Sequence, residues 1–184
     1  MEEKGLYDRF AAKIASVNGE CYRAANQKEM LALITEALQK RKAAKVAMFP
    51  SPLIEEAGIQ TALTKGGYEV IIEDLRQKIP QATVGITEAR WGIAELGTLV
   101  QYAPEVDNRL CSTFVDTHIA LLKCPAILPG LDEALAEIAS GGTLPGYVGF
   151  ITGPSRSSDI ERVLTVGVHG PKELVVIVVD EGGR

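Results

Sequence analysis

Residues 147–180, YVGFITGPSRSSDIERVLTVGVHGPKELVVIVVD, decide the fold that the sequence predicts. Two apolar runs, YVGFIT at 147–152 and LVVIVVD at 174–180, enclose a segment rich in Gly, Pro, Ser, Arg and His. Both runs are short and lack polar alternation, which favours strands buried on both faces, as in a parallel sheet. Ligands of open α/β sheets bind beyond the carboxyl ends of the strands, so we expect the chemistry in TGPSR, the loop that leaves the first run.

This loop has the features of an anion site. Ser158 and Glu161 form an S-x-x-E capping box, which predicts a helix from about Asp159 and leaves unpaired backbone N–H groups beside residues 155–157. Arg156 adds a fixed guanidinium fork that suits a carboxylate or a phosphate. A capped helix with a solvated arginine explains the same pattern equally well.

The connection GVHGP at 167–171 extends the candidate site. Its two glycines let the backbone approach a ligand or adopt a positive φ, and a neutral imidazole on His169 is available as a proton acceptor near pH 7. A tight connection with a surface histidine is the alternative. The predicted substrate- or anion-binding residues are Thr152, Gly153, Ser155, Arg156, Ser157, Gly167 and Gly170, with Thr87 and Thr98 from an earlier segment.

Three stretches together carry a family resemblance. ITGPSRSSDIE, GVHGPKEL and the earlier GITEARWGIAELGTLV resemble the lactate-utilisation protein C family, which is built on the LUD domain, and the match runs over residues 84–180. The resemblance implies a NagB/RpiA/CoA-transferase-like α/β fold. It also implies a role with two iron–sulfur partner proteins in oxidising L-lactate to pyruvate, with the clusters on the partners and no cofactor in this chain.

Composition and charge set limits on the function. At 184 residues and 46% hydrophobic content, the chain is predicted to form one domain over residues 1–184, with an N-terminal helix within 1–20 and a frayed tail at 181–184. A net charge of −5 argues against a nucleic-acid or anionic-membrane surface. Without a membrane-length apolar run or a signal-peptide pattern, the expected location is the cytoplasm.

The cysteines and the missing motifs exclude several sites. Cys21, Cys111 and Cys124 lie far apart and form no C-x-x-C pair, so iron–sulfur clusters would have to come from a partner. The sequence holds no G-x-G-x-x-G, no P-loop and no H-E-x-x-H, which disfavours bound NAD, bound ATP and a zinc site. We therefore expect no metal and no self-contained dehydrogenase.

Apolar runs that alternate with helical patterns predict the βαβ order of a mostly parallel sheet covered by helices. Asn26 and Glu29 mark the start of one helix, Ser51 and Pro52 mark another, and WGIAELG at 91–97 is expected to be a short helix or helical turn. ECYRA at 20–24 is a candidate short edge strand. The remaining strands, about seven, are KVAMF at 45–49, YEVII at 68–72, VGIT at 84–87, TLVQY at 98–102, HIALL at 118–122, YVGFI at 147–151 and LVVIVV at 174–179.

The segment after VGIT holds a second group of candidates. Glu88 falls at a strand end, where carboxylates serve as bases or nucleophiles, and a solvated surface residue is the alternative. Trp91 is either a pocket wall or core packing. Glu95 stands in an E-x-G pattern similar to the glutamate turn of class I CoA-transferases, whose carboxylate attacks an acyl-CoA. A turn carboxylate that caps nearby N–H groups is the alternative. Leu96 departs from the E-T-G-T that is usual in the family.

The leading hypothesis is a cytoplasmic subunit of an L-lactate-oxidising system. It contributes a small-anion pocket or a docking surface for iron–sulfur partners, with His169 and Glu95 as the catalytic candidates. An acyl or CoA transferase that uses Glu95 is one alternative, and a non-catalytic ligand-binding or scaffold module is another. Activity of the isolated chain distinguishes the transferase, and ligand-induced stabilisation without turnover distinguishes the binding module.

Overall fold

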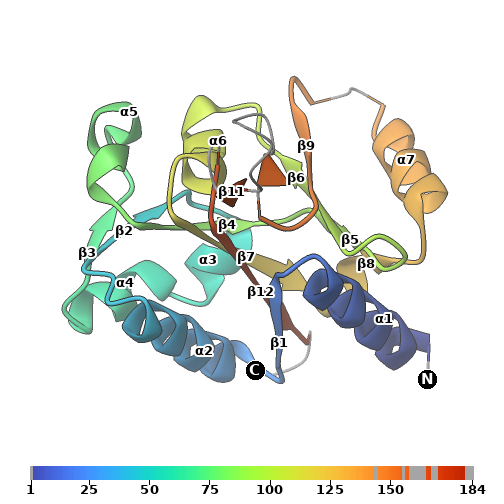
Figure 1. Cartoon of the computed structure of the whole chain (residues 1–184), viewed down its shortest axis with the longest axis horizontal. Coiled ribbons are helices and arrows are strands. Elements are labelled where there is room, and N and C mark those ends of the chain that lie inside the picture. Colours follow the sequence, from blue (N-terminus) through green and yellow to red (C-terminus); the bar gives the residue numbers. More distant parts are fainter. Residues whose placement is uncertain (1, 143–144, 155, 158–164, 167–169, 181–184) are drawn as a thin grey trace.

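The computed structural model describes residues 2–142, 145–154, 156–157, 165–166 and 170–180 (Figure 1). Its helices are α1 (Glu2–Ser16), α2 (Gln27–Lys40), α3 (Pro52–Glu56), α4 (Ile59–Lys65), α5 (Leu75–Lys78), η1 (Ile79–Gln81), α6 (Val106–Thr113), η2 (Cys124–Ala126) and α7 (Leu131–Ser140). Its strands are β1 (Glu20–Ala24), β2 (Lys45–Met48), β3 (Glu69–Ile71), β4 (Val84–Glu88), β5 (Trp91–Ile93), β6 (Thr98–Tyr102), β7 (Thr117–Lys123), β8 (Ile127–Leu128), β9 (Val148–Ile151), β10 (Arg156–Ser157), β11 (Thr165–Val166) and β12 (Glu173–Val179).

A six-stranded parallel sheet forms the centre of the fold. Its strand order is β1-β12-β7-β4-β2-β3, and every neighbouring pair is parallel. β12 and β7 lie inside the sheet and are buried over almost their whole length, as their unbroken apolar sequences predict. The α/β class is therefore confirmed, and ECYRA is the predicted edge strand.

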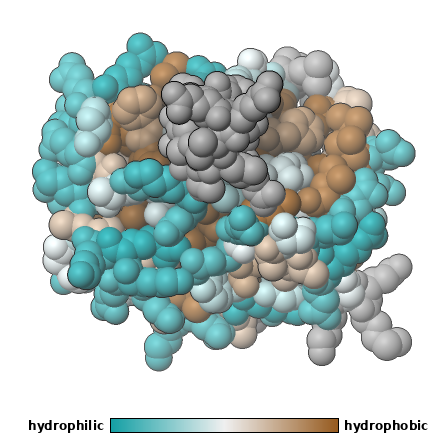
Figure 2. Space-filling view, in the orientation of Figure 1, coloured by the Kyte–Doolittle hydropathy of each residue, from teal (hydrophilic) through white to brown (hydrophobic). Residues whose placement is uncertain are grey.

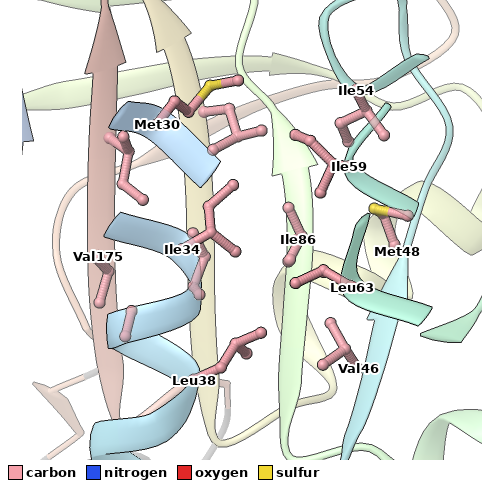
Figure 3. Close-up of a cluster of buried hydrophobic side chains, with 14 of the residues drawn as sticks. Met30, Ile34, Leu38, Val46, Met48, Ile54, Ile59, Leu63, Ile86 and Val175 are labelled. Atoms are coloured by element: carbon pink, nitrogen blue, oxygen red, sulfur yellow. The ribbon is translucent and has the colours of Figure 1, made fainter. Parts of the chain in front are cut away.

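Helices cover one face of this sheet with a continuous apolar core. Met30, Ile34 and Leu38 recur at helical spacing on α2 and are fully buried. They pack in one cluster with residues of the sheet that include Ile86 and Val175, and α3 and α4 complete the layer (Figure 3).

Two different layers cover the other face. α5 and α6 lie over β2 and β4, above the sheet in the view of Figure 1, and bury a cluster that includes Ala47, Leu75 and Cys111. α1 and a second sheet lie over β7 and β12, where Phe10 of α1 and Leu99 of β6 join one cluster with strand residues.

This second sheet corrects two predictions. Its order is β8-β5-β6-β9, with β5–β6 and β6–β9 antiparallel. WGIAELG, the expected short helix, is strand β5 followed by a turn, in which Gly97 has φ 63° and an ideal Cβ would lie 2.7 Å from the backbone nitrogen of Ile14. YVGFI, the expected parallel strand buried on both faces, is β9, paired only with β6 among the described residues, with Phe150 46% exposed. Short apolar runs carry no period that distinguishes these environments.

The helix expected from about Asp159 falls in residues 158–164, outside the described part of the chain. Beside it, Arg156 and Ser157 pair antiparallel with Val166 and Thr165. The predicted tail at 181–184 is likewise outside the described residues. Among the helices that the structure describes, none has the length and apolarity to cross a bilayer.

Candidate functional site

A cavity of about 590 Å³ opens at the carboxyl edge of the parallel sheet. Its wall is built mainly from the segments that follow three parallel strands, at 49–52 after β2, 88–90 at the end of β4 and 123–126 at the end of β7. Parallel pairing brings these ends together, because Met48 pairs with Ile86 and Glu88 pairs with Leu121. The lining residues are Phe49, Pro50, Ser51, Pro52, Glu88, Ala89, Arg90, Trp91, Tyr102, Glu105, Asn108, Lys123, Pro125 and Ala126.

The chain passes from the large sheet to the small one in the cavity wall. The backbone nitrogen of Ala89 donates to the carbonyl of Leu121 in β7 at 2.8 Å, and that of Arg90 donates to Val100 in β6 at 2.8 Å. Residues 88–91 are thus held by both sheets, and their side chains have a rigid support.

Charged groups of both signs line the cavity. A carboxylate oxygen of Glu88 accepts a 3.1 Å hydrogen bond from the backbone nitrogen of Leu53 in the first turn of α3. The Arg90 guanidinium lies 5.1 Å from the ring centroid of Trp91, within the range of a cation–π contact. Lys123 and Glu105 add one further charge of each sign.

Aromatic and amide groups form the adjoining part of the wall. The rings of Trp91 and Tyr102 meet edge to face, with centroids 5.3 Å apart and planes at 88°. The side chain of Asn108 accepts from Gln101 at 2.7 Å and donates to the carbonyl of Tyr102 at 3.0 Å. Asn108 and Gln101 are buried, so this pair fixes the backbone that carries Tyr102.

The Ser51 hydroxyl oxygen is buried and has no hydrogen-bond partner among the described residues. Ser51 is the N-cap residue of α3, as the sequence predicts, but its side chain makes no capping bond. The Glu88 carboxylate binds the first turn of this helix instead.

The predicted loop site begins at the other edge of the sheet. An ideal Cβ on Gly153 would lie 2.8 Å from the carbonyl oxygen of Val17, which shortly precedes β1. Gly170 comes just before β12, where the backbone nitrogen of Lys172 donates to the carbonyl of Asp116 at 2.8 Å. Gly170 lies at the amino edge, opposite the cavity, because it precedes the parallel strand β12. Gly153 lies at the same edge, because β9 belongs to the small sheet and pairs antiparallel with β6.

Several predicted site residues lie outside the described part of the chain. These are Ser155, Gly167 and His169, together with the side chains of Arg156 and Ser157. Their convergence on one ligand stays a prediction. Thr152 is described, and its hydroxyl lies 2.7 Å from that of Thr98 on the neighbouring strand.

Glu95 and Thr87 have structural partners. A carboxylate oxygen of Glu95 accepts a 2.9 Å hydrogen bond from the backbone nitrogen of Leu131 at the start of α7, and Arg9 lies 3.8 Å from the other oxygen. Thr87 is buried and shares a 2.8 Å hydrogen bond with Nε2 of His118. Neither Glu95 nor Thr87 lines the cavity.

Sequence reasoning found part of this cavity. Glu88 was singled out by its position at a strand end and Trp91 as a candidate pocket wall, and both line the cavity. Arg90 and Lys123 were missed, although the strand-end rule applied to HIALLK would have found Lys123. Tyr102 and Asn108 join the wall through pairing between distant segments, which no local pattern reveals.

No group of three or more His, Cys, Asp or Glu side chains capable of holding a metal ion occurs within the described ranges. Burial raises the pKa of the Cys21 thiol to about 12, and burial does the same for Cys111. Both thiols are therefore protonated at neutral pH.

The family model described as LUD domain matches residues 7–179. Lactate utilization protein C of Halalkalibacterium halodurans is 34% identical over 156 residues, which cover 80% of this chain and 68% of that protein. The protein of the same name from Bacillus subtilis is 37% identical over 144 residues, 71% of this chain and 60% of that protein. The protein of the same name from Bacillus licheniformis is 38% identical over 109 residues, which cover 57% of this chain and 45% of that protein.

The matched part of this chain thus spans about half to two thirds of the length of these curated relatives. A crystal structure of a DUF162 family protein from Deinococcus radiodurans superposes with a TM-score of 0.71 at 19% identity, over 97% of this chain and 99% of that one. This likeness shows the fold. Because the family model covers nearly the whole sequence, the chain belongs to the LUD domain family, and it is a relative of proteins named Lactate utilization protein C.

Proposed function

We propose that the chain is a cytoplasmic subunit of an L-lactate utilisation system that oxidises L-lactate to pyruvate together with iron–sulfur partner proteins. Its own contribution is the carboxyl-edge cavity, which binds the small carboxylate. The names of the relatives support the lactate role, and the cavity supports the ligand.

One observation carries the ligand assignment. Arg90 and Glu88 line the same cavity, two residues apart on a segment that both sheets hold. A guanidinium suits the carboxylate of a hydroxy acid, and a carboxylate suits its hydroxyl group as a proton acceptor. Arg90 therefore binds the acid, and Glu88 accepts the hydroxyl proton when the alcohol becomes a ketone. The carbon-bound hydrogen leaves as a second proton, and the two electrons of its bond pass to the iron–sulfur partners.

The electron acceptors of this proposal lie on the partners. Cys21, Cys111 and Cys124 are dispersed in the sequence, and a cluster needs several thiolates in one place. A docking surface is offered by the face around β9 and α7, where hydrophobic residues appear at the upper right of Figure 2. Phe150 and Leu135 are 46% and 48% exposed there.

Lactate titration into the isolated chain, followed by calorimetry, tests the ligand. Arg90→Ala should weaken binding by roughly 10- to 100-fold, the equivalent of a charged hydrogen bond of about 1.5 to 3 kcal/mol. Arg76→Ala, an arginine on α5 that does not line the cavity, is the matched control. Equal affinity in both variants would remove Arg90 from the proposal.

The variant Arg156→Ala distinguishes the two candidate binding sites for the acid, the cavity and the loop that contains Arg156. If the loop that contains Arg156 and His169 binds the acid, this variant weakens lactate binding and Arg90→Ala does not. The proposal that the cavity binds the acid requires the opposite result.

Co-purification tests the subunit role. The chain, co-expressed with candidate iron–sulfur proteins, should elute with them in size-exclusion chromatography, and Phe150→Ser should abolish co-elution. Phe114→Ser, which removes an even more exposed phenylalanine at the end of α6, is the control. Clean separation of the wild-type chain at high concentration would contradict the subunit role.

A further inference from the structure

The carboxyl-edge cavity is much larger than the acid assigned to it. At about 30 Å³ for each heavy atom, the share of a water molecule in the liquid, a lactate ion fills roughly 180 Å³. The cavity volume is about 590 Å³, which falls in the range of roughly 300 to 1,000 Å³ that organic ligands occupy. About two thirds of the space is therefore left for a second ligand.

Ring-bearing residues make up much of the cavity wall. Six of the fourteen lining residues carry rings, namely Phe49, Pro50, Pro52, Trp91, Tyr102 and Pro125. Proline side chains lose no rotamer freedom on binding, and aromatic rings supply large contact areas at low entropic cost. The Arg90 guanidinium, which lies over the Trp91 ring, adds another planar surface on which rings stack.

The balance of charge in the cavity points the same way. Two cations, Arg90 and Lys123, and two carboxylates, Glu88 and Glu105, line it, so their formal charges sum to zero. A second ligand that is polyanionic, such as a nucleotide with several phosphates, has no cluster of cations to meet it. An uncharged or singly charged planar ring suits the wall better.

From these observations we propose that the cavity holds a planar conjugated organic ring against Arg90, Trp91 and Tyr102, beside the small acid. The ring belongs to the flavin or quinone class, which shares a flat, conjugated, weakly charged body. The proposal rests on the proposed function only for the identity of the neighbouring acid.

Trp91 provides a direct probe, because it is the single tryptophan of the chain. Riboflavin and 1,4-naphthoquinone-2-sulfonate, titrated into the isolated chain, test the two sources of such a ring. A saturable quenching of Trp91 emission by at least one of them, at micromolar to submillimolar concentration, is the expected result. Failure of both to quench up to millimolar concentration overturns the proposal.

Substitutions then locate the ring by calorimetry, which needs no tryptophan. Trp91→Phe keeps an aromatic face and should bind the ring within about threefold of wild type, whereas Trp91→Leu should weaken it by roughly 5- to 10-fold. Phe114→Leu, an exposed aromatic outside the cavity, is the control and should bind like wild type. Equal binding by Trp91→Leu and Phe114→Leu overturns the assignment.

A competition experiment distinguishes this inference from the proposed function. Lactate titrated into the ring-saturated chain should still bind, because the acid hydrogen-bonds to the edge of the Arg90 guanidinium while the ring stacks on its face. Complete mutual exclusion overturns the two-ligand site. If the ring binds and lactate fails to bind with or without it, the lactate assignment falls and the ring site stands.

Discussion

Thr87 on β4 and His118 on β7 share a 2.8 Å hydrogen bond in the core, and Nδ1 of His118 has no partner among the described residues. His118 is 1% exposed, and burial lowers the pKa of its imidazole from 6.5 to about 4. The ring is therefore neutral in the folded protein over the whole physiological range.

The free energy of unfolding should fall as the pH drops from about 6.5 to about 4. In that window His118 is protonated in the unfolded chain and neutral in the folded chain, so a fall in pH favours unfolding. Between pH 7.5 and pH 5 this group alone contributes a loss of about 2 kcal/mol. Urea denaturation at the two pH values measures it. His118→Gln removes the titrating group, and a variant with an unchanged pH dependence would contradict the assignment.

Glu95 should behave as a helix cap. Its carboxylate binds the first backbone nitrogen of α7, whose N-cap position is occupied by Gly130, a residue without a side-chain acceptor. Glu95→Ala should lower the free energy of unfolding by about 0.5 to 2 kcal/mol, and Glu95→Gln, which retains an acceptor oxygen, should lose less. Thermal or urea denaturation ranks the stabilities of the wild type, Glu95→Gln and Glu95→Ala. The transferase alternative requires a thioester adduct on Glu95 in intact-mass spectra after incubation with acyl-CoA, and we expect none.

Gly85 should tolerate no side chain. An ideal Cβ at this position would lie 1.9 Å from the carbonyl oxygen of Cys111, so α6 packs directly on the backbone of β4. Gly85→Ala must displace a helix that carries Asn108 of the cavity wall, at a cost of about 1 to 3 kcal/mol or more. Gly5→Ala on α1, where the new methyl group meets nothing within 4 Å, should instead gain about 0.5 to 1 kcal/mol. Urea denaturation of the two variants compares these effects.

Local signals predicted the large sheet well. The N-x-x-E pattern at Asn26 marked the start of α2, where the backbone nitrogen of Glu29 donates to the Asn26 side chain. The Glu29 carboxylate in turn accepts from the backbone nitrogen of Ala25, one residue before the cap. Runs such as LVVIVV predicted buried strands because only a doubly covered sheet buries both faces of a strand. These signals lie within a few residues of one another, so the sequence displays them.

Pairing between distant segments was not predictable in this way. YVGFI has the same apolar character as LVVIVV, yet it pairs antiparallel with β6 at an edge. That difference places Gly153, where the expected ligand loop begins, beside Val17 at the amino edge of the sheet. The cavity itself depends on contacts such as that between Trp91 and Tyr102, which meet only after β5 and β6 have paired.

The amide pair of Gln101 and Asn108, of which Asn108 lines the cavity, should behave as one unit. Both side chains are buried, and Asn108 donates to the carbonyl of Tyr102, which orients the ring beside Trp91. Asn108→Ala leaves the amide of Gln101 and the carbonyl of Tyr102 without these hydrogen bonds, and should lower the free energy of unfolding by about 1 to 3 kcal/mol. Replacing both partners by leucine leaves no unpaired side-chain amide, so the double variant should lose less than the sum of the two single leucine variants.

Urea denaturation of the wild type, Gln101→Leu, Asn108→Leu and the double variant completes this cycle. Trp91 emission provides an independent readout, because release of the Tyr102 backbone exposes the indole and shifts its emission to longer wavelength in Asn108→Ala. Additive losses across the cycle would show that the two amides act separately. An unshifted emission maximum would show that Asn108 supports the core without orienting the cavity wall.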